Sequence, residues 1–182
     1  MPIVNLNRPG MAIRAESEPH IEVHKFRSGA VAGAAFLAIV LQAFLSYRFA
    51  RADLLELPFL VTLYFGLSRR NPNTGLLLGM VIGLLQDAVS GVAIGLYGIA
   101  KTLVGYGAST FGARLDVDHP ISRLLLTFLF FHFHHVVLAT VKRLILAEPE
   151  VFFSVNLFVA SLANAVLALA LFSLLDRLRK SS

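Results

Sequence analysis

The 182-residue chain contains no cysteine, and only 15% of its residues are charged. Without cysteine it cannot build a disulfide framework, a thiolate nucleophile or a Cys-ligated metal or cluster site. Soluble domains have about 25% charged and about 45–50% apolar residues, whereas 57% of this chain is hydrophobic and its mean hydropathy is +0.74. The composition therefore excludes a soluble globular enzyme and a disordered chain, and it indicates a membrane protein.

The sequence motifs of the common catalytic classes are also absent. The chain has no phosphate-binding loop, no dinucleotide-binding loop and no paired acid/base carboxylates. Ser154 and Ser161 could meet His132 or His135, as an intramembrane serine protease requires, but neither serine lies in a Gly-x-Ser-x-Gly context. We therefore expect no enzymatic activity, no catalytic residues and no cofactor.

A polar tail, residues 1–27, precedes six apolar segments that occupy almost every later residue. A transmembrane helix needs about 20 residues, and these long apolar runs lack the alternation of a β-barrel. We expect an all-α membrane protein, a bundle of six transmembrane helices in one domain over 28–176, with a basic cytoplasmic end at 177–182. A cleaved signal peptide ending near residues 50–52 is the competing interpretation of the first segment. The segments are 28–47, 54–67, 74–89, 91–115, 121–146 and 151–175.

Lysine and arginine are distributed unevenly between the two sides of such a bundle. With the N-terminus in the cytoplasm, eleven of these residues lie on the cytoplasmic side and four on the other, and Lys101 lies inside a segment. Because an excess of positive charge marks cytoplasmic loops, we expect both termini in the cytoplasm and no nucleic-acid partner. The eleven are Arg8, Arg14, Lys25, Arg27, Arg69, Arg70, Arg114, Arg123, Arg177, Arg179 and Lys180; the four are Arg48, Arg51, Lys142 and Arg143.

Small residues recur with helical spacing in the third and fourth segments. In the third segment Gly75, Gly79 and Gly83 follow one another every four residues. Small residues let helices approach closely in lipid, so we expect these two segments to pack against each other or against a partner helix. The stripe in the fourth segment, with alternating steps of four and three, consists of Gly91, Gly95, Gly98, Thr102, Gly105, Ser109 and Gly112.

Lys101 lies about ten residues into the fourth segment, close to the expected bilayer centre. A lysine at that depth costs at least ~2.5–3.5 kcal/mol, so it should face a partner or a wet cavity. Asp87 is the closest carboxylate in sequence and the candidate ion-pair partner. In the alternative interpretation Lys101 snorkels to the interface and Asp87 caps the hairpin in water.

His132, His134 and His135 form a histidine cluster in the fifth segment. His132 and His135 share a helix face, but two histidines make an incomplete metal site. We expect no metal, and interpret the cluster as polar packing, interhelical hydrogen bonding or a partner contact.

The sequence LLQDAVSG at 84–91, followed by GLYG at 95–98 and AKTLVGY at 100–106, resembles the central signature of the rod-shape-determining protein MreD family. The resemblance covers about residues 54–115. One departure is Phe59, because the family often has Asp or Asn at this position after the proline.

The resemblance implies a non-enzymatic inner-membrane subunit of the bacterial cell-elongation machinery. Its partners would be the bitopic protein MreC and, through it, the peptidoglycan transpeptidase, RodA and the MreB cytoskeleton, with a homodimer left open. The resemblance also implies the fold of the substrate-binding subunits of energy-coupling-factor transporters. Such a subunit, with Lys101 contacting an anionic or polar ligand, is the alternative function. The residues expected to form the helix-packing and partner interface are Gly75, Gly79, Gly83, Asp87, Gly91, Gly95, Gly98, Lys101 and Gly105.

Overall fold

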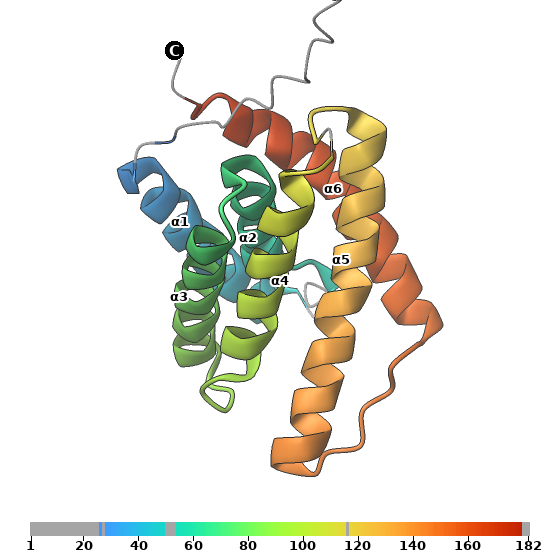
Figure 1. Ribbon diagram of the computed structural model, residues 1–182. Helices are drawn as coiled ribbons and strands as arrows, with labels where there is room; N and C mark the ends of the chain where they lie inside the picture. The colour runs from blue at the N-terminus through green and yellow to red at the C-terminus, as the bar shows by residue number, and fades with distance from the viewer. Residues whose placement is uncertain (1–25, 27, 50–53, 116, 180–182) are drawn as a thin grey trace, which may run out of the picture.

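The computed structural model describes residues 26, 28–49, 54–115 and 117–179, so most of the predicted polar tail and the last residues lie outside it. Its six α-helices over these residues confirm the expected all-helical class (Figure 1). An isolated backbone bridge joins Phe26 to Arg179. The helices are α1 (Ser28–Arg48), α2 (Leu57–Arg69), α3 (Pro72–Ser90), α4 (Leu96–Gly112), α5 (Pro120–Val141, extended by a π-helical segment, Lys142–Leu146) and α6 (Val155–Asp176).

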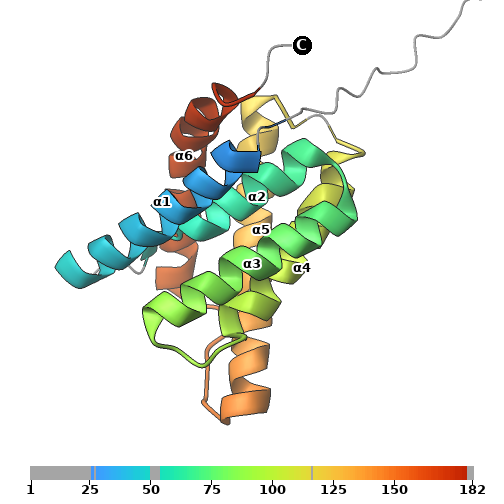
Figure 2. The same ribbon diagram turned by 90° about the vertical axis from the view of Figure 1, so that its left-hand side faces the viewer.

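The helices alternate in direction along the chain (Figures 1 and 2). The start of α1, the α2–α3 turn, the α4–α5 loop and the end of α6 lie together at the top of Figure 1, which we name the terminal end. The end of α1, the start of α2, the α3–α4 turn and the α5–α6 loop lie toward the opposite end, the distal end.

Four of the helices, α1, α3, α5 with its extension, and α6, are long and apolar enough to cross a membrane. Helix α2 has 13 residues and α4 has 17, which correspond to about 20 Å and about 26 Å against a hydrocarbon core of about 30 Å. The fourth apolar segment was predicted to begin at residue 91, but its helix begins at Leu96.

Helix α2 is the centre of the bundle. Every residue from 58 to 68 is buried, including Phe59, Leu60, Leu63 and Phe65 at 0% exposure. The helix packs against α1, α3, α4, α5 and α6. A helix surrounded by other helices is apolar on all sides. The central position of α2 therefore explains why its residues are hydrophobic around the whole helix.

Prolines and capping side chains set the helix starts. Asn71 follows Arg70, which has a φ of 55°, and its side chain accepts a hydrogen bond from the Thr74 amide at 3.2 Å. The Ser154 hydroxyl accepts one from the Leu157 amide at 3.1 Å. Such caps satisfy amides that have no partner within the helix. Pro58, Pro72 and Pro120 lie in the first turns of α2, α3 and α5, where a missing amide costs nothing.

The outer helices expose large apolar side chains instead of polar ones. Examples are Phe36 on α1, Leu125 and Leu129 on α5, and Val166 on α6, each more than half exposed. In water such surfaces would be a liability, whereas in a bilayer they contact lipid tails. The exposed faces therefore agree with the composition in indicating a membrane environment.

Candidate functional site: the α3–α4 hairpin and its buried polar cluster

Helices α3 and α4 form a hairpin closed by glycines. A Cβ atom on Gly79 would overlap the backbone carbonyl of Lys101, and one on Gly83 would overlap the carbonyl of Tyr97. Since backbone atoms cannot yield as a flexible side chain can, larger residues would force the helices apart. The remaining close contacts of the predicted interface residues join Gly75 to Gly105 and place Gly98 against Leu84 of α3.

Gly91 and Gly95 lie in the turn between the helices and not in the packed seam. Their φ angles are 66° and 105°, and a Cβ on either would meet no atom within 4 Å. Positive φ is the conformation that glycine adopts without a steric penalty. These two residues therefore reverse the chain between α3 and α4. Their spacing fits the small-residue stripe of the fourth segment, but they lie before the first residue of α4, Leu96.

Asp87, at 0% exposure, caps the start of α4 from the neighbouring helix. Its carboxylate accepts hydrogen bonds from the backbone amides of Gly95 at 2.8 Å, Tyr97 at 2.9 Å and Gly98 at 3.1 Å. A carboxylate at a helix N-terminus satisfies orphan amides and opposes the positive end of the helix dipole. The hairpin is thus fixed at its turn as well as along its seam.

Lys101 pairs with a carboxylate that sequence reasoning did not select. Its Nζ lies 3.3 Å from Glu56 Oε2, 3.5 Å from His134 Nε2 and 4.5 Å from the centre of the Tyr97 ring. The expected ion pair with Asp87 is wrong, because Asp87 is occupied by backbone amides. Lys101 does not snorkel either, since it is 0% exposed.

Glu56 is held in place by the two helices at the edge of the bundle. Its backbone amide donates to Asn164 Oδ1 of α6 at 2.9 Å, and the next amide, of Leu57, donates to Gln42 Oε1 of α1 at 3.1 Å. Asn164 also donates to the Leu54 carbonyl at 2.6 Å. Helices α2 and α4 both start toward the distal end. The position of Glu56 at the start of an apolar segment was therefore the sequence feature that could have identified it as the partner of Lys101.

His134 is the histidine that faces the interior, at 0% exposure, and with Glu56 and Lys101 it forms the buried polar cluster. A Lys101 ammonium can donate to His134 Nε2 when the ring proton is on Nδ1, and Nδ1 has no partner among the described residues. His132 bonds to the Phe128 carbonyl of its own helix, and His135 packs on Phe131. No group of metal-ligating side chains gathers in the described part of the chain.

A second polar network ties the helices together at the terminal end. Arg123 contacts Asp176 at 2.9 Å and Asp118 at 3.2 Å, and Arg179 contacts both carboxylates at 2.8 Å. The Tyr64 hydroxyl donates to Asp176 at 2.8 Å. Burial acts to lower the pKa of Arg179, but its hydrogen bonds with Asp118 and Tyr64 outweigh that effect and raise it. The network joins α2, α5, α6 and the α4–α5 loop.

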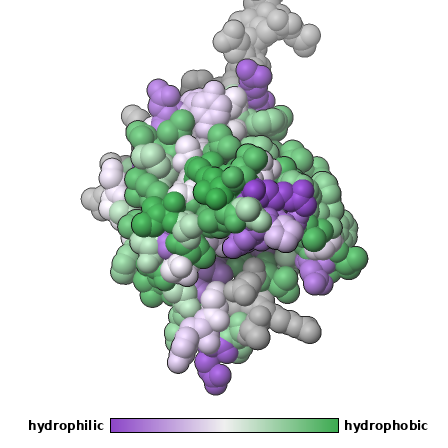
Figure 3. Space-filling view, turned by 90° about the horizontal axis from the view of Figure 1, so that it is seen from below, coloured by the Kyte–Doolittle hydropathy of each residue, from purple (hydrophilic) through white to green (hydrophobic). Residues whose placement is uncertain are grey.

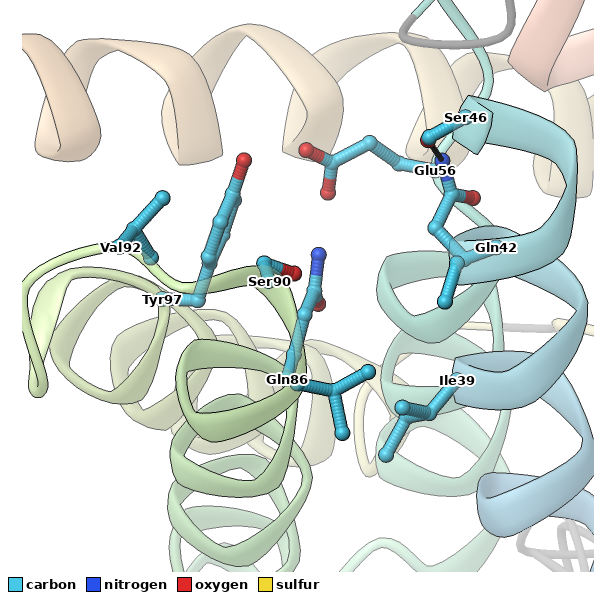
Figure 4. Close-up of a pocket in the computed structure, with 10 residues that line it drawn as sticks. Ile39, Gln42, Ser46, Glu56, Gln86, Ser90, Val92 and Tyr97 are labelled. Carbon is cyan, nitrogen blue, oxygen red and sulfur yellow. Dashed lines mark hydrogen bonds between the residues drawn. The ribbon is translucent and has the colours of Figure 1, made fainter. Parts of the chain in front are cut away.

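Two surface hollows are lined by described residues. The first, the polar pocket, has a volume of about 430 Å³ at the distal end between α1, the start of α2 and the α3–α4 turn (Figure 4). Seen from below, the distal face is largely hydrophobic, with hydrophilic residues toward its middle (Figure 3). The polar pocket is lined by Ile39, Gln42, Ala43, Ser46, Glu56, Gln86, Val89, Ser90, Val92 and Tyr97.

The second hollow, the apolar groove, has a volume of about 380 Å³ and runs between α1 and α6. Its α1 side begins with small residues, and a Cβ on Gly33 would meet no atom within 4 Å. Arg177 is the charged residue of its lining. The groove is lined by Ala30, Gly33, Ala34, Leu37, Ala38, Leu41, Leu57, Leu171, Leu174, Leu175, Arg177 and Leu178.

These features define a multi-pass helical membrane protein with a glycine-closed hairpin and a buried ion pair. The family of rod shape-determining protein MreD matches the chain over residues 27–178. The chain therefore belongs to the MreD family, whose members are shape-determining membrane proteins. The comparisons with curated proteins and with solved structures found no match.

Proposed function

We propose that this chain is a non-enzymatic scaffold in the bacterial inner membrane, where it joins MreC to the peptidoglycan-synthesis enzymes and so maintains rod shape. Membership of the MreD family supports a role in rod-shape determination. The bundle is braced by the α3–α4 seam, the buried polar cluster and the terminal-end network. A braced body whose outer surface is apolar suits the holding of other membrane helices.

The proposed topology has six crossings with both termini in the cytoplasm. The alternating directions of the helices support it, because α2 and α4 traverse the bundle although they are short. Among the described residues, six Lys and Arg lie at the terminal end and three at the distal end, which favours a cytoplasmic terminal end. The six are Arg69, Arg70, Arg114, Arg123, Arg177 and Arg179; the three are Arg48, Lys142 and Arg143, while Arg8, Arg14, Lys25, Arg27, Arg51 and Lys180 lie outside the described residues.

The apolar groove is the proposed docking site for the membrane helix of MreC, and it is the observation that carries the scaffold function. The α3–α4 seam is filled by its own two helices, so its glycines cannot receive a third one. In the groove, by contrast, Gly33 and its neighbours Ala30 and Ala34 leave α1 open to close approach. Small residues on an open helix face are the usual contact surface for a second membrane helix.

Substituting Gly33 tests the groove. Because a side chain at this position meets nothing within the chain, Gly33→Leu should leave the fold intact and reduce co-purification of MreC at least tenfold. Ala32→Leu is the matched control, since Ala32 is exposed on α1 but does not line the groove. Undiminished recovery of MreC with Gly33→Leu would refute the groove as its docking site.

Affinity purification of the tagged chain from its native membranes tests the wider partnership. We expect mass spectrometry to recover MreC together with the transpeptidase and RodA, with MreB recovered more weakly because its link is indirect. Failure to recover any elongation protein in a mild detergent would count against the scaffold function.

A substrate-binding membrane subunit of a small-molecule transporter is the second candidate function. The polar pocket favours it, because a hollow lined by both polar and apolar residues suits a small molecule. The same purification discriminates between the two functions. A transporter subunit would bring down an energy-coupling membrane protein with paired ATPases and no elongation proteins.

A further inference from the structure

The polar pocket has the size and the mixed lining of a small-molecule site. Its volume of about 430 Å³ falls in the range of about 300–1,000 Å³ that is typical of such sites. One part of the lining is apolar, formed by Ile39, Ala43, Val89 and Val92. The other part carries hydrogen-bonding groups from α1, the start of α2, α3 and α4, namely Gln42, Ser46, Glu56, Gln86, Ser90 and Tyr97.

Three of these polar side chains converge on one space. Figure 4 shows the Gln86 amide, the Glu56 carboxylate and the Tyr97 hydroxyl pointing toward the same part of the pocket from three different segments. The segments are fixed independently of any ligand, because Asp87 anchors the α3–α4 turn and Asn164 anchors the backbone of Glu56. The pocket is therefore built by the fold.

Gln86 presents a hydrogen-bond donor to the pocket. Its side chain is 4% exposed, and Figure 4 shows its amide nitrogen directed toward the space between Glu56 and Tyr97. Its Oε1 atom is buried without a hydrogen-bond partner among the described residues and is out of reach of a molecule in the pocket. A hydroxyl or carbonyl oxygen of a molecule in the pocket can accept a hydrogen bond from the amide nitrogen.

Among the described residues the pocket offers no unpaired charge to an ionic ligand. Glu56 is the one described lining residue that belongs to the Asp, Glu, Lys and Arg group, and its negative charge is balanced by Lys101 at 3.3 Å. A charged ligand would therefore enter without a counter-charge, and burying an unpaired charge is unfavourable. The apolar lining provides a surface on which a compact ring can lie.

We infer that the polar pocket binds a neutral molecule that carries hydroxyl or amide groups on a compact ring, as a monosaccharide does. The same chemistry is found in a free sugar and in the sugar head group of a lipid. This inference goes beyond the scaffold function, since neither the groove nor the partners of the chain enter the argument.

The test uses the full chain in phosphatidylcholine nanodiscs, prepared without sugar-based detergents, and saturation-transfer difference NMR. The probes are N-acetylglucosamine and glucose, with glucosamine and glucuronic acid as charged counterparts. We expect the neutral sugars to bind and the charged ones to bind at least tenfold more weakly. Octyl glucoside, used below its critical micelle concentration, is the probe for a lipid head group. Tighter binding of octyl glucoside than of glucose would assign the pocket to the sugar head group of a lipid. Equal binding of the two would assign the pocket to a free sugar.

Two pocket variants and one matched control locate the binding. Ala43→Phe fills the pocket from its α1 wall, and Gln86→Leu removes the amide donor at nearly constant volume; each should weaken binding at least tenfold. Ala32→Phe makes the same change on the outward face of α1 and should bind as the wild type does. Circular dichroism verifies that each variant is folded.

Three results would overturn the inference. The first is that neither neutral sugar binds the folded wild type. The second is that binding survives in both pocket variants, which would place it elsewhere on the protein. The third is that a charged sugar binds as well as the neutral ones. None of these results bears on recovery of MreC, so the pocket and the scaffold function fail independently.

Discussion

At the scale of single residues, the buried pair of Glu56 and Lys101 is the most consequential feature. Burying two opposite charges inside a bundle costs desolvation free energy, which is offset only if the charges are paired and hydrogen-bonded. Glu56 is the N-cap residue of α2, Lys101 lies in the second turn of α4, and His134 of α5 also contacts Lys101. Three helices are thereby held in one relative position.

Replacing Lys101 with methionine should destabilise the fold by about 3–5 kcal/mol, because Glu56 is left buried and uncompensated. The matched control is Lys142→Met, which breaks an ion pair whose side chains are 33% and 35% exposed and should cost only about 0–1 kcal/mol. Unfolding followed by circular dichroism measures both. Similar losses in the two variants would contradict the assigned role of Lys101, and Glu56→Gln combined with Lys101→Met should recover much of the loss.

Replacing Asp87 with alanine should loosen the start of α4. Three amides, of Gly95, Tyr97 and Gly98, lose their acceptor, and the loss of a helix cap typically costs about 1–2 kcal/mol. Hydrogen exchange measured by mass spectrometry should accelerate over 95–98 while the second half of α4 stays protected. Unchanged exchange at these amides would show that Asp87 does not cap the helix.

At the scale of elements, the long apolar runs predicted the helices well and the start of α4 poorly. The apolar segments match α1, α3, α5 and α6 closely, because long hydrophobic runs have one stable form in lipid. The start of α4 was misplaced because Gly91 and Gly95 continue the helical spacing while adopting positive φ. The role of Glu56 was missed because pairing between distant segments depends on tertiary arrangement, which sequence proximity to Lys101 does not report.

The glycine seam makes a prediction with an internal control. Gly79→Ala should destabilise the α3–α4 hairpin by about 1–3 kcal/mol, because its Cβ would overlap the Lys101 carbonyl. Gly33→Ala is the same change where there is open space, and it should be neutral or stabilising by up to about 1 kcal/mol. Thermal unfolding of the two variants provides the comparison. Equal stability of the Gly79→Ala and Gly33→Ala variants would contradict this prediction, because it would mean that α3 and α4 can move apart at the seam without loss of stability.

At the scale of the whole molecule, α2 is the buried axis and the other helices surround it. Its residues 58–68 contact protein on every side, so the outer helices provide the outer surface of the bundle. The terminal-end network and the buried polar cluster brace the bundle at different levels. Under the proposed scaffold function, a partner helix would dock on the outer surface of this braced bundle, and the apolar groove is part of that surface.

The topology can be tested with single cysteines, because the natural chain has none to interfere. Tyr47, 90% exposed, lies near the distal end, and Arg114 lies exposed in the α4–α5 loop at the terminal end. In intact spheroplasts a membrane-impermeant maleimide should label Tyr47→Cys and leave Arg114→Cys unlabelled until the membrane is opened. Labelling of Arg114→Cys in sealed spheroplasts would reverse the proposed orientation.

The most direct test of the scaffold account is disulfide cross-linking to MreC in native membranes. Leu37→Cys places a thiol in the apolar groove, and Leu125→Cys places one on the lipid-facing side of α5, where the side chain is also more than half exposed. Each variant is paired with single cysteines placed in turn along the membrane helix of MreC. We expect cross-links from Leu37→Cys with helical periodicity along the MreC helix and none from Leu125→Cys. Cross-links from Leu125→Cys alone, or from neither position, would contradict the scaffold account.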